Sequence, residues 1–77
     1  MEASMAVSVI SGTVQRVFLP RGYCFVRGDD QVLYFLHATE VPEGTWDGDH
    51  IRLGVRVTFT PTKTEEGWRA TGAKLCG

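Results

Sequence analysis

Aromatic side chains recur at every second position in two short segments of the sequence. Tyr23 and Phe25 stand two residues apart, and so do Phe35 and His37. Side chains two residues apart on a β-strand project from the same face of the sheet. Because only a turn separates the two segments, we expect the strands to pair as a hairpin that brings the four rings side by side.

The positions between the rings carry residues suited to a protein interior, namely Cys24, Val26, Tyr34 and Leu36. If these residues point inward, the four rings lie open to solvent beside Arg27. Such a surface suits single-stranded nucleic acid, because unpaired bases stack on flat rings and guanidinium groups hold phosphates. In the alternative arrangement the rings fill the core. The polar ends of His37 and Arg27 would then be buried as well, and each group left without a partner would cost roughly 2–7 kcal/mol.

Strand signals dominate the rest of the chain. β-branched residues and alternating patterns predict strands over residues 7–18, 23–27, 31–37, 55–60 and 68–75. Turns are predicted over 19–22, 28–30 and 63–67, and a long polar loop over 38–53. Five short strands in so small a chain predict an all-β fold, a five-stranded antiparallel barrel in which a three-strand meander precedes a hairpin.

Length and composition limit the chain to one small domain. Its 77 residues are 43% hydrophobic and 22% charged, which predicts a folded unit with an ordered core over about residues 7–75. So small a core leaves little room for an enclosed catalytic cleft, and we expect no enzyme. No apolar run reaches the ~20 residues of a membrane helix, and the first residues do not resemble a signal peptide. We therefore expect a cytoplasmic protein with no membrane partner.

The net charge of −1 hides an uneven distribution along the chain. Residues 1–28 carry a net charge of +2, residues 29–50 carry −6, and residues 51–77 carry +3. This segregation predicts one positive face and an acidic edge, or alternatively a solvated surface on which the two signs mix.

Other site chemistries find little support in the sequence. Cys24, Cys76, His37 and His50 lack the spacing of zinc ligands, and Cys24 and His37 are expected on opposite faces, which argues against a nucleophile pair. The two cysteines form no disulfide framework and indicate reduced thiols, with Cys76 near a fraying chain end. The acidic residues of segment 40–49 do not match a calcium-loop spacing, and no Walker-type phosphate loop is present. We expect no metal, no cofactor and no catalytic residue.

Residues 12–26, GTVQRVFLPRGYCFV, follow without gaps the pattern Gly-Thr-Val-Lys-Trp-Phe-Asn, two variable residues, and Lys-Gly-Phe-Gly-Phe-Ile. That pattern opens the cold-shock domain. Residues 34–41 resemble the second motif of this family, Val-Phe-Val-His-Phe-Ser-Ala-Ile, and residues 54–59 and 67–71 resemble its closing strands. The resemblance, to a bacterial cold-shock protein, covers roughly residues 8–75. It implies an OB-type Greek-key barrel that binds single-stranded RNA or DNA.

The resemblance also implies roles for particular side chains. It implies that the four alternating rings stack on bases and that Arg21 stands where the family has a phosphate-contacting lysine. Arg16, Trp46 and Arg69 are further candidates. The full set of expected nucleic-acid-binding residues is Arg16, Arg21, Tyr23, Phe25, Phe35, His37, Trp46 and Arg69.

Several positions depart from the family pattern. The replacements are Gln15 for a lysine, Arg16 for a stacking tryptophan, Phe18 for an asparagine, Cys24 for a glycine and Ala38 for an aromatic residue. Two platform rings are therefore missing. We expect Trp46 either to stack on a base or to pack over the mouth of the barrel, and Trp68 either to add a ring or to pack within its hairpin.

Two functions follow from these observations. The first is binding of single-stranded RNA or DNA with low sequence specificity, as an RNA chaperone or a regulator of transcription or translation. The second is a protein-interaction or self-association module with weak nucleic-acid binding, for which Phe18, Leu19 and Pro20 would form an apolar docking patch. The sequence leaves the oligomeric state open between a monomer and a weak dimer.

Overall fold

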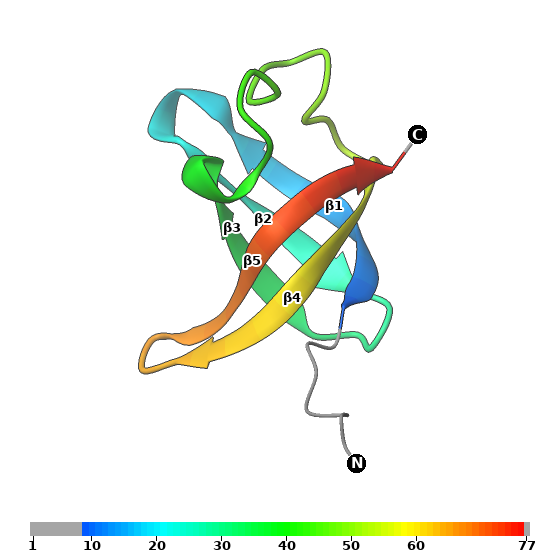
Figure 1. Cartoon of the computed structure of the whole chain (residues 1–77), viewed down its shortest axis with the longest axis vertical. Coiled ribbons are helices and arrows are strands. Elements are labelled where there is room, and N and C mark those ends of the chain that lie inside the picture. The colour runs from blue at the N-terminus through cyan, green and yellow to red at the C-terminus, as the bar shows by residue number, and fades with distance from the viewer. Residues whose placement is uncertain (1–8, 77) are drawn as a thin grey trace.

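The computed structural model describes residues 9–76 and consists of five strands and two single-turn 3₁₀ helices (Figure 1). The elements in chain order are β1 (Ile10–Phe18), η1 (Leu19–Arg21), β2 (Tyr23–Gly28), β3 (Leu33–His37), η2 (Ala38–Glu40), β4 (Arg56–Thr64) and β5 (Gly67–Cys76). All five predicted strands are confirmed. Residues 7–8, which the prediction included in the first strand, lie outside the described residues.

The last hairpin is longer than predicted. β4 continues past Pro61 to Thr64, and β5 begins at Gly67, so only two residues remain for the turn that the sequence placed over 63–67. Gly67 has φ +125°, a backbone conformation that favours glycine and lets the chain reverse here. At the other end of this hairpin Cys76 pairs with Arg56, so β5 continues through Cys76, and fraying there stays a prediction.

The strands close into a ring in the order β1-β2-β3-β5-β4. Neighbouring strands are antiparallel except β3 and β5, which pair in parallel through Phe35 with Arg69 and Leu36 with Ala70. The prediction of a purely antiparallel sheet is therefore wrong. The reason is one of parity, because strand direction cannot alternate all the way around a ring with an odd number of members. One parallel pair is unavoidable, and it lies where the three-strand meander meets the second hairpin.

The interior of the ring contains the side chains that alternation predicts. Cys24, Val26 and Leu36 are fully buried and Tyr34 is 2% exposed. The other strands add Val14, Val57, Phe59, Ala70 and Ala73. Burial of these apolar groups is the main source of stability in so small a domain.

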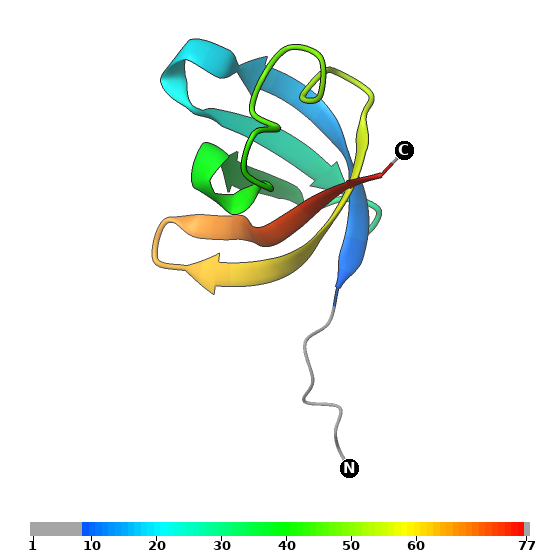
Figure 2. The ribbon, with the colours of Figure 1, turned by 45° about the horizontal axis from the view of Figure 1, so that its top comes forward.

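The segment between η2 and β4 also contributes to the core, although the sequence predicts a polar loop there. Val41 and Ile51 are buried in the same cluster, and Trp46 packs against it. Figure 2 shows this segment across one end of the closed sheet. Val41 and Ile51 are ten residues apart, and the residues between them follow neither the strand nor the helix period. The sequence pattern therefore did not predict that these two side chains are buried.

A bulge in β1 changes which side its residues face. The register with β2 runs Val14 to Val26 and then Arg16 to Phe25, leaving Gln15 as the extra residue. Without the bulge, Arg16 and Phe18 would share the inner face with Val14. The extra residue turns both of them outward, and Val17 takes the inward position opposite Cys24.

Candidate nucleic-acid interface

The four rings predicted from alternation lie together on the outer face of β2 and β3. Tyr23 pairs with His37 and Phe25 pairs with Phe35 across the two strands. The ring centroids of Tyr23 and Phe35 lie 5.3 Å apart, those of Phe25 and Phe35 lie 5.9 Å apart, and those of Phe35 and His37 lie 6.3 Å apart. All four side chains are partly exposed, while the residues between them are buried. The arrangement in which these rings fill the core is therefore wrong.

A fifth ring belongs to the same cluster and was not among the expected site residues. Phe18 lies 5.1 Å from Tyr23 and 6.3 Å from Phe25, measured between ring centroids. The bulge at Gln15 brings it there, and the only sign of the bulge in the sequence is the pair of adjacent polar residues, Gln15 and Arg16, in an apolar strand. We call the five rings of Phe18, Tyr23, Phe25, Phe35 and His37 the aromatic face.

The three residues of the expected docking patch differ in their surroundings. Phe18 contacts the aromatic face, Leu19 packs against the core, and Pro20 is exposed on η1. The three residues thus lie in three different environments.

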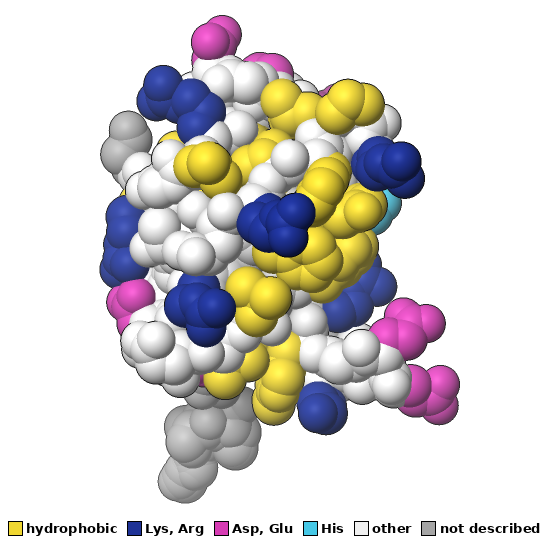
Figure 3. All heavy atoms as spheres, turned by 180° about the vertical axis from the view of Figure 1, so that it is seen from behind, with side chains coloured by type: hydrophobic (Ala, Val, Ile, Leu, Met, Phe, Trp, Pro, Cys, Tyr) yellow, Lys and Arg dark blue, Asp and Glu magenta, His cyan; other side chains and the backbone are white. Residues whose placement is uncertain are grey.

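Cationic side chains border the aromatic face. The Arg16 guanidinium carbon lies 5.4 Å from the Phe18 ring centroid, and that of Arg69 lies 5.1 Å from the Phe35 ring centroid. Arg27 is exposed near the end of β2, and Arg21 is exposed at the end of η1, two residues before that strand begins. Figure 3 shows the hydrophobic side chains of this side of the molecule with Lys and Arg side chains around them and Asp and Glu side chains at the margins.

Two carboxylates of the acidic segment 29–50 are paired within the protein. Asp29 accepts two hydrogen bonds of 2.9 Å from the Arg56 guanidinium, and Asp47 lies 2.7 Å from His50 Nδ1. These contacts hold the pKa of both carboxyl groups below the usual value for aspartate.

His37 is held in one orientation by the turn that follows it. It is the N-cap of η2, and its Nδ1 accepts a hydrogen bond of 3.2 Å from the Thr39 backbone N–H. Glu40 anchors the same turn, since its carboxylate accepts a hydrogen bond of 2.9 Å from the Gly72 backbone N–H on β5. Because Nδ1 is an acceptor, the neutral ring carries its proton on Nε2.

The two tryptophans lie in different surroundings. Trp46 Nε1 donates a hydrogen bond of 3.0 Å to the Leu19 carbonyl and its ring packs against the core, which favours the packing interpretation. Its stacking role remains a prediction. Trp68 is 39% exposed, lies edge-on to Tyr34 at 5.9 Å, and has Lys63 Nζ 5.1 Å from its ring centroid.

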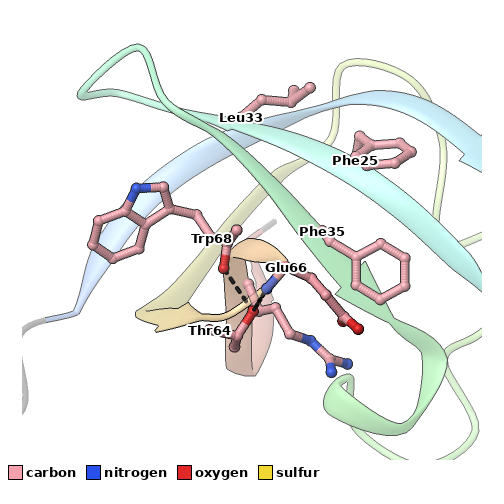
Figure 4. A pocket seen from close by; sticks show the side chains of 8 residues that line it. Phe25, Leu33, Phe35, Thr64, Glu66 and Trp68 are labelled. Carbon is pink, nitrogen blue, oxygen red and sulfur yellow. Dashed lines mark hydrogen bonds between the residues drawn. The ribbon is translucent and has the colours of Figure 1, made fainter.

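A groove of about 360 Å³ extends the aromatic face toward the β4–β5 turn. Figure 4 shows Phe25, Leu33 and Phe35 on its β2–β3 side and Thr64, Glu66 and Trp68 on its β4–β5 side. Phe25 and Phe35 belong to both the groove and the aromatic face, so the two surfaces are continuous.

The remaining reactive groups form no second centre in the part of the chain that the structure describes. No cluster of three or more His, Cys, Asp or Glu side chains there is arranged to hold a metal ion. Burial raises the pKa of the Cys24 thiol to about 11, which makes it a poor nucleophile. No helix within residues 9–76 is long and apolar enough to cross a membrane.

Comparison with known proteins identifies the fold. The chain is similar to a solved structure of the Drosophila protein Unr that carries its cold-shock domains 4, 5 and 6, with a TM-score of 0.75 and 24% sequence identity. The chain has a cold-shock domain fold. The match covers 96% of this chain and 29% of that one, so it spans less than a third of the Unr structure. No protein-family model matches the sequence, and no curated protein does.

Proposed function

We propose that this protein binds single-stranded nucleic acid by stacking bases on the aromatic face. The observation that carries the proposal is the contiguous set of five partly exposed rings with Arg16 and Arg69 over two of them. Stacking on an aromatic side chain contributes roughly 1–3 kcal/mol per base and tolerates any sequence, because every base has a π-face. The cold-shock fold supports the same class of ligand.

The arrangement favours unpaired strands over duplexes. A base stacked on Phe25 or Phe35 is unavailable for pairing, so binding competes directly with hairpin formation. Exposed arginines such as Arg16 and Arg21 would hold the backbone phosphates. We therefore propose an RNA-chaperone role, or regulation of transcription or translation through the same opening of paired segments. The free thiols of Cys24 and Cys76 fit the cytoplasmic location that the sequence predicts.

Fluorescence anisotropy of a labelled seven-nucleotide oligo-dT or oligo-rU tests the binding proposal. We expect a saturable rise at micromolar protein in low salt, weakened by added salt. A matched hairpin carrying a fluorophore and a quencher should open as protein is added, whereas a fully paired duplex of the same composition should not compete. Absence of binding at micromolar protein and low salt would refute the proposal.

The second hypothesis, a protein-interaction or self-association module, predicts the opposite result. It expects weak oligonucleotide binding and a concentration-dependent increase in mass by light scattering. Phe18→Ser does not separate the two hypotheses, because Phe18 is part of the aromatic face. The exposed Pro20 is the better probe, since Pro20→Ser changes the turn surface and leaves the five rings in place.

A further inference from the structure

The groove beside the aromatic face has walls suited to one more base. Phe25, Leu33 and Phe35 line one side and Trp68 lies across from them. Its volume of about 360 Å³ is within the range of ~300–1,000 Å³ typical of small-molecule sites. Because Phe25 and Phe35 line the groove and also belong to the aromatic face, a strand stacked on these rings passes its next base directly into the groove.

The polar groups of the groove differ from those of the aromatic face. Thr64 Oγ1 is already engaged, since it donates to the Gly67 carbonyl at 2.8 Å and accepts from the Glu66 backbone N–H at 3.2 Å. The Glu66 side chain extends toward the Phe35 ring (Figure 4), and among the described residues no ion pair or hydrogen bond engages its carboxylate. Arg69 Nε is buried and has no hydrogen-bond partner there. The groove is therefore lined by the Glu66 carboxylate, which has no partner among residues 9–76, and by the side chain of Arg69.

A carboxylate in a base-binding groove selects by the number of donors on the base. Guanine carries two adjacent donors, N1–H and the N2 amino group, which match the two oxygens of one carboxylate. The other bases place an acceptor beside their donor group, which repels the second carboxylate oxygen. The O6 atom of guanine is an acceptor for arginine. We infer that this groove, with Glu66 as the specificity-determining residue, binds guanine in preference to the other bases.

This inference rests on the proposed function. Oligonucleotides that differ in a single base test the guanine preference separately from strand binding itself. The probes are labelled seven-nucleotide oligo-dT strands in which the central base is thymine, guanine, hypoxanthine, adenine or cytosine. Hypoxanthine keeps N1–H and O6 but lacks the N2 amino group. We expect the guanine strand to bind wild-type protein about 5- to 150-fold more tightly than the others, the range for one bidentate contact. The hypoxanthine strand should lose most of that gain.

Two charge-matched variants test the role of Glu66. Glu66→Gln should bring the guanine strand close to the thymine strand in affinity, because an amide offers one acceptor and one donor group. Glu65→Gln is the control, since it removes the same charge from the same turn but Glu65 does not line the groove. The Glu65→Gln variant should keep the guanine preference.

Each outcome bears on one claim. Equal affinity for all five strands would overturn the guanine assignment and leave strand binding intact. A guanine preference that survives in Glu66→Gln would overturn the role of Glu66. If no strand binds at all, the proposed function fails and the inference fails with it.

Discussion

At the scale of single residues, Phe35 is the centre of the candidate interface. Its ring contacts Tyr23, Phe25 and His37, and the Arg69 guanidinium lies over it. Phe35→Leu keeps an apolar side chain but removes the flat surface. We expect it to weaken oligo-dT binding about 5- to 150-fold, the equivalent of roughly 1–3 kcal/mol of stacking, as measured by anisotropy. Val9→Ala, at an exposed apolar side chain outside the aromatic face, should leave the affinity unchanged.

The two thiols should differ sharply in reactivity. Cys24 is fully buried and its thiol pKa is raised to about 11, whereas Cys76 is exposed. Thiolate is the reactive form, so a disulfide reagent such as DTNB at pH 8 should label one thiol quickly in the native protein and a second only after denaturant is added. Cys76→Ser should abolish the fast phase. Fast reaction of both thiols in the native state would contradict the burial of Cys24.

At the scale of elements, the bulge in β1 decides what residue 16 can do. It places Arg16 on the outer face opposite Phe25 and beside Phe18. A ring at this position would extend the aromatic face, so Arg16→Trp should tighten oligo-dT binding at 0.5 M salt by up to the value of one stacked base, roughly 1–3 kcal/mol. The gain should shrink at low salt, because the variant also loses a cation. An affinity unchanged from wild type at both salt concentrations would show that residue 16 does not reach the bound strand.

The β2–β3 hairpin should make stability depend on acid pH. The Tyr34 hydroxyl donates a hydrogen bond of 2.7 Å to Asp30, and Val32 N–H donates a second of 3.0 Å. Both bonds lower the pKa of the Asp30 carboxyl below 3.8. A lowered native pKa means that this stabilisation is present above pH 3.8 and is lost as the pH falls through the native value.

Urea unfolding at pH 7 and pH 3 measures that dependence. Asp30→Asn should reduce the difference between the two free energies of unfolding, since the variant has no carboxyl to protonate. Tyr34→Phe should reduce it as well, because it removes the principal donor to Asp30. The dependence that remains should come from Asp29 and Asp47, whose pKa values are also lowered. An unchanged difference in both variants would exclude the Asp30 contact as a cause.

At the scale of the whole molecule, the charge distribution matters more than the net charge of −1. Arg16 and Arg69 lie over rings of the aromatic face, and Arg21 is exposed on η1. If each of the three holds one phosphate of a single strand, the slope of log K against log salt should be about −2. Arg21→Gln should reduce the magnitude of the slope by about 0.7. Arg52→Gln removes the same charge from a separate hollow lined by Arg56 and Cys76, and should leave the slope unchanged.

The sequence by itself determined the strands, the inward and outward alternation of β2 and β3, and thereby four of the five rings of the aromatic face. Alternation is a local property of an extended chain, so it can be deduced without knowing the partner strands. Three features depended on tertiary structure. The bulge at Gln15 arises from the pairing of β1 with β2, and it alone carries Phe18 to the outer face. Val41 and Ile51 are buried because a patternless loop folds across the end of the closed sheet. The groove exists because ring closure sets β3 parallel to β5, which brings Phe35 beside Arg69 although they are far apart in the chain.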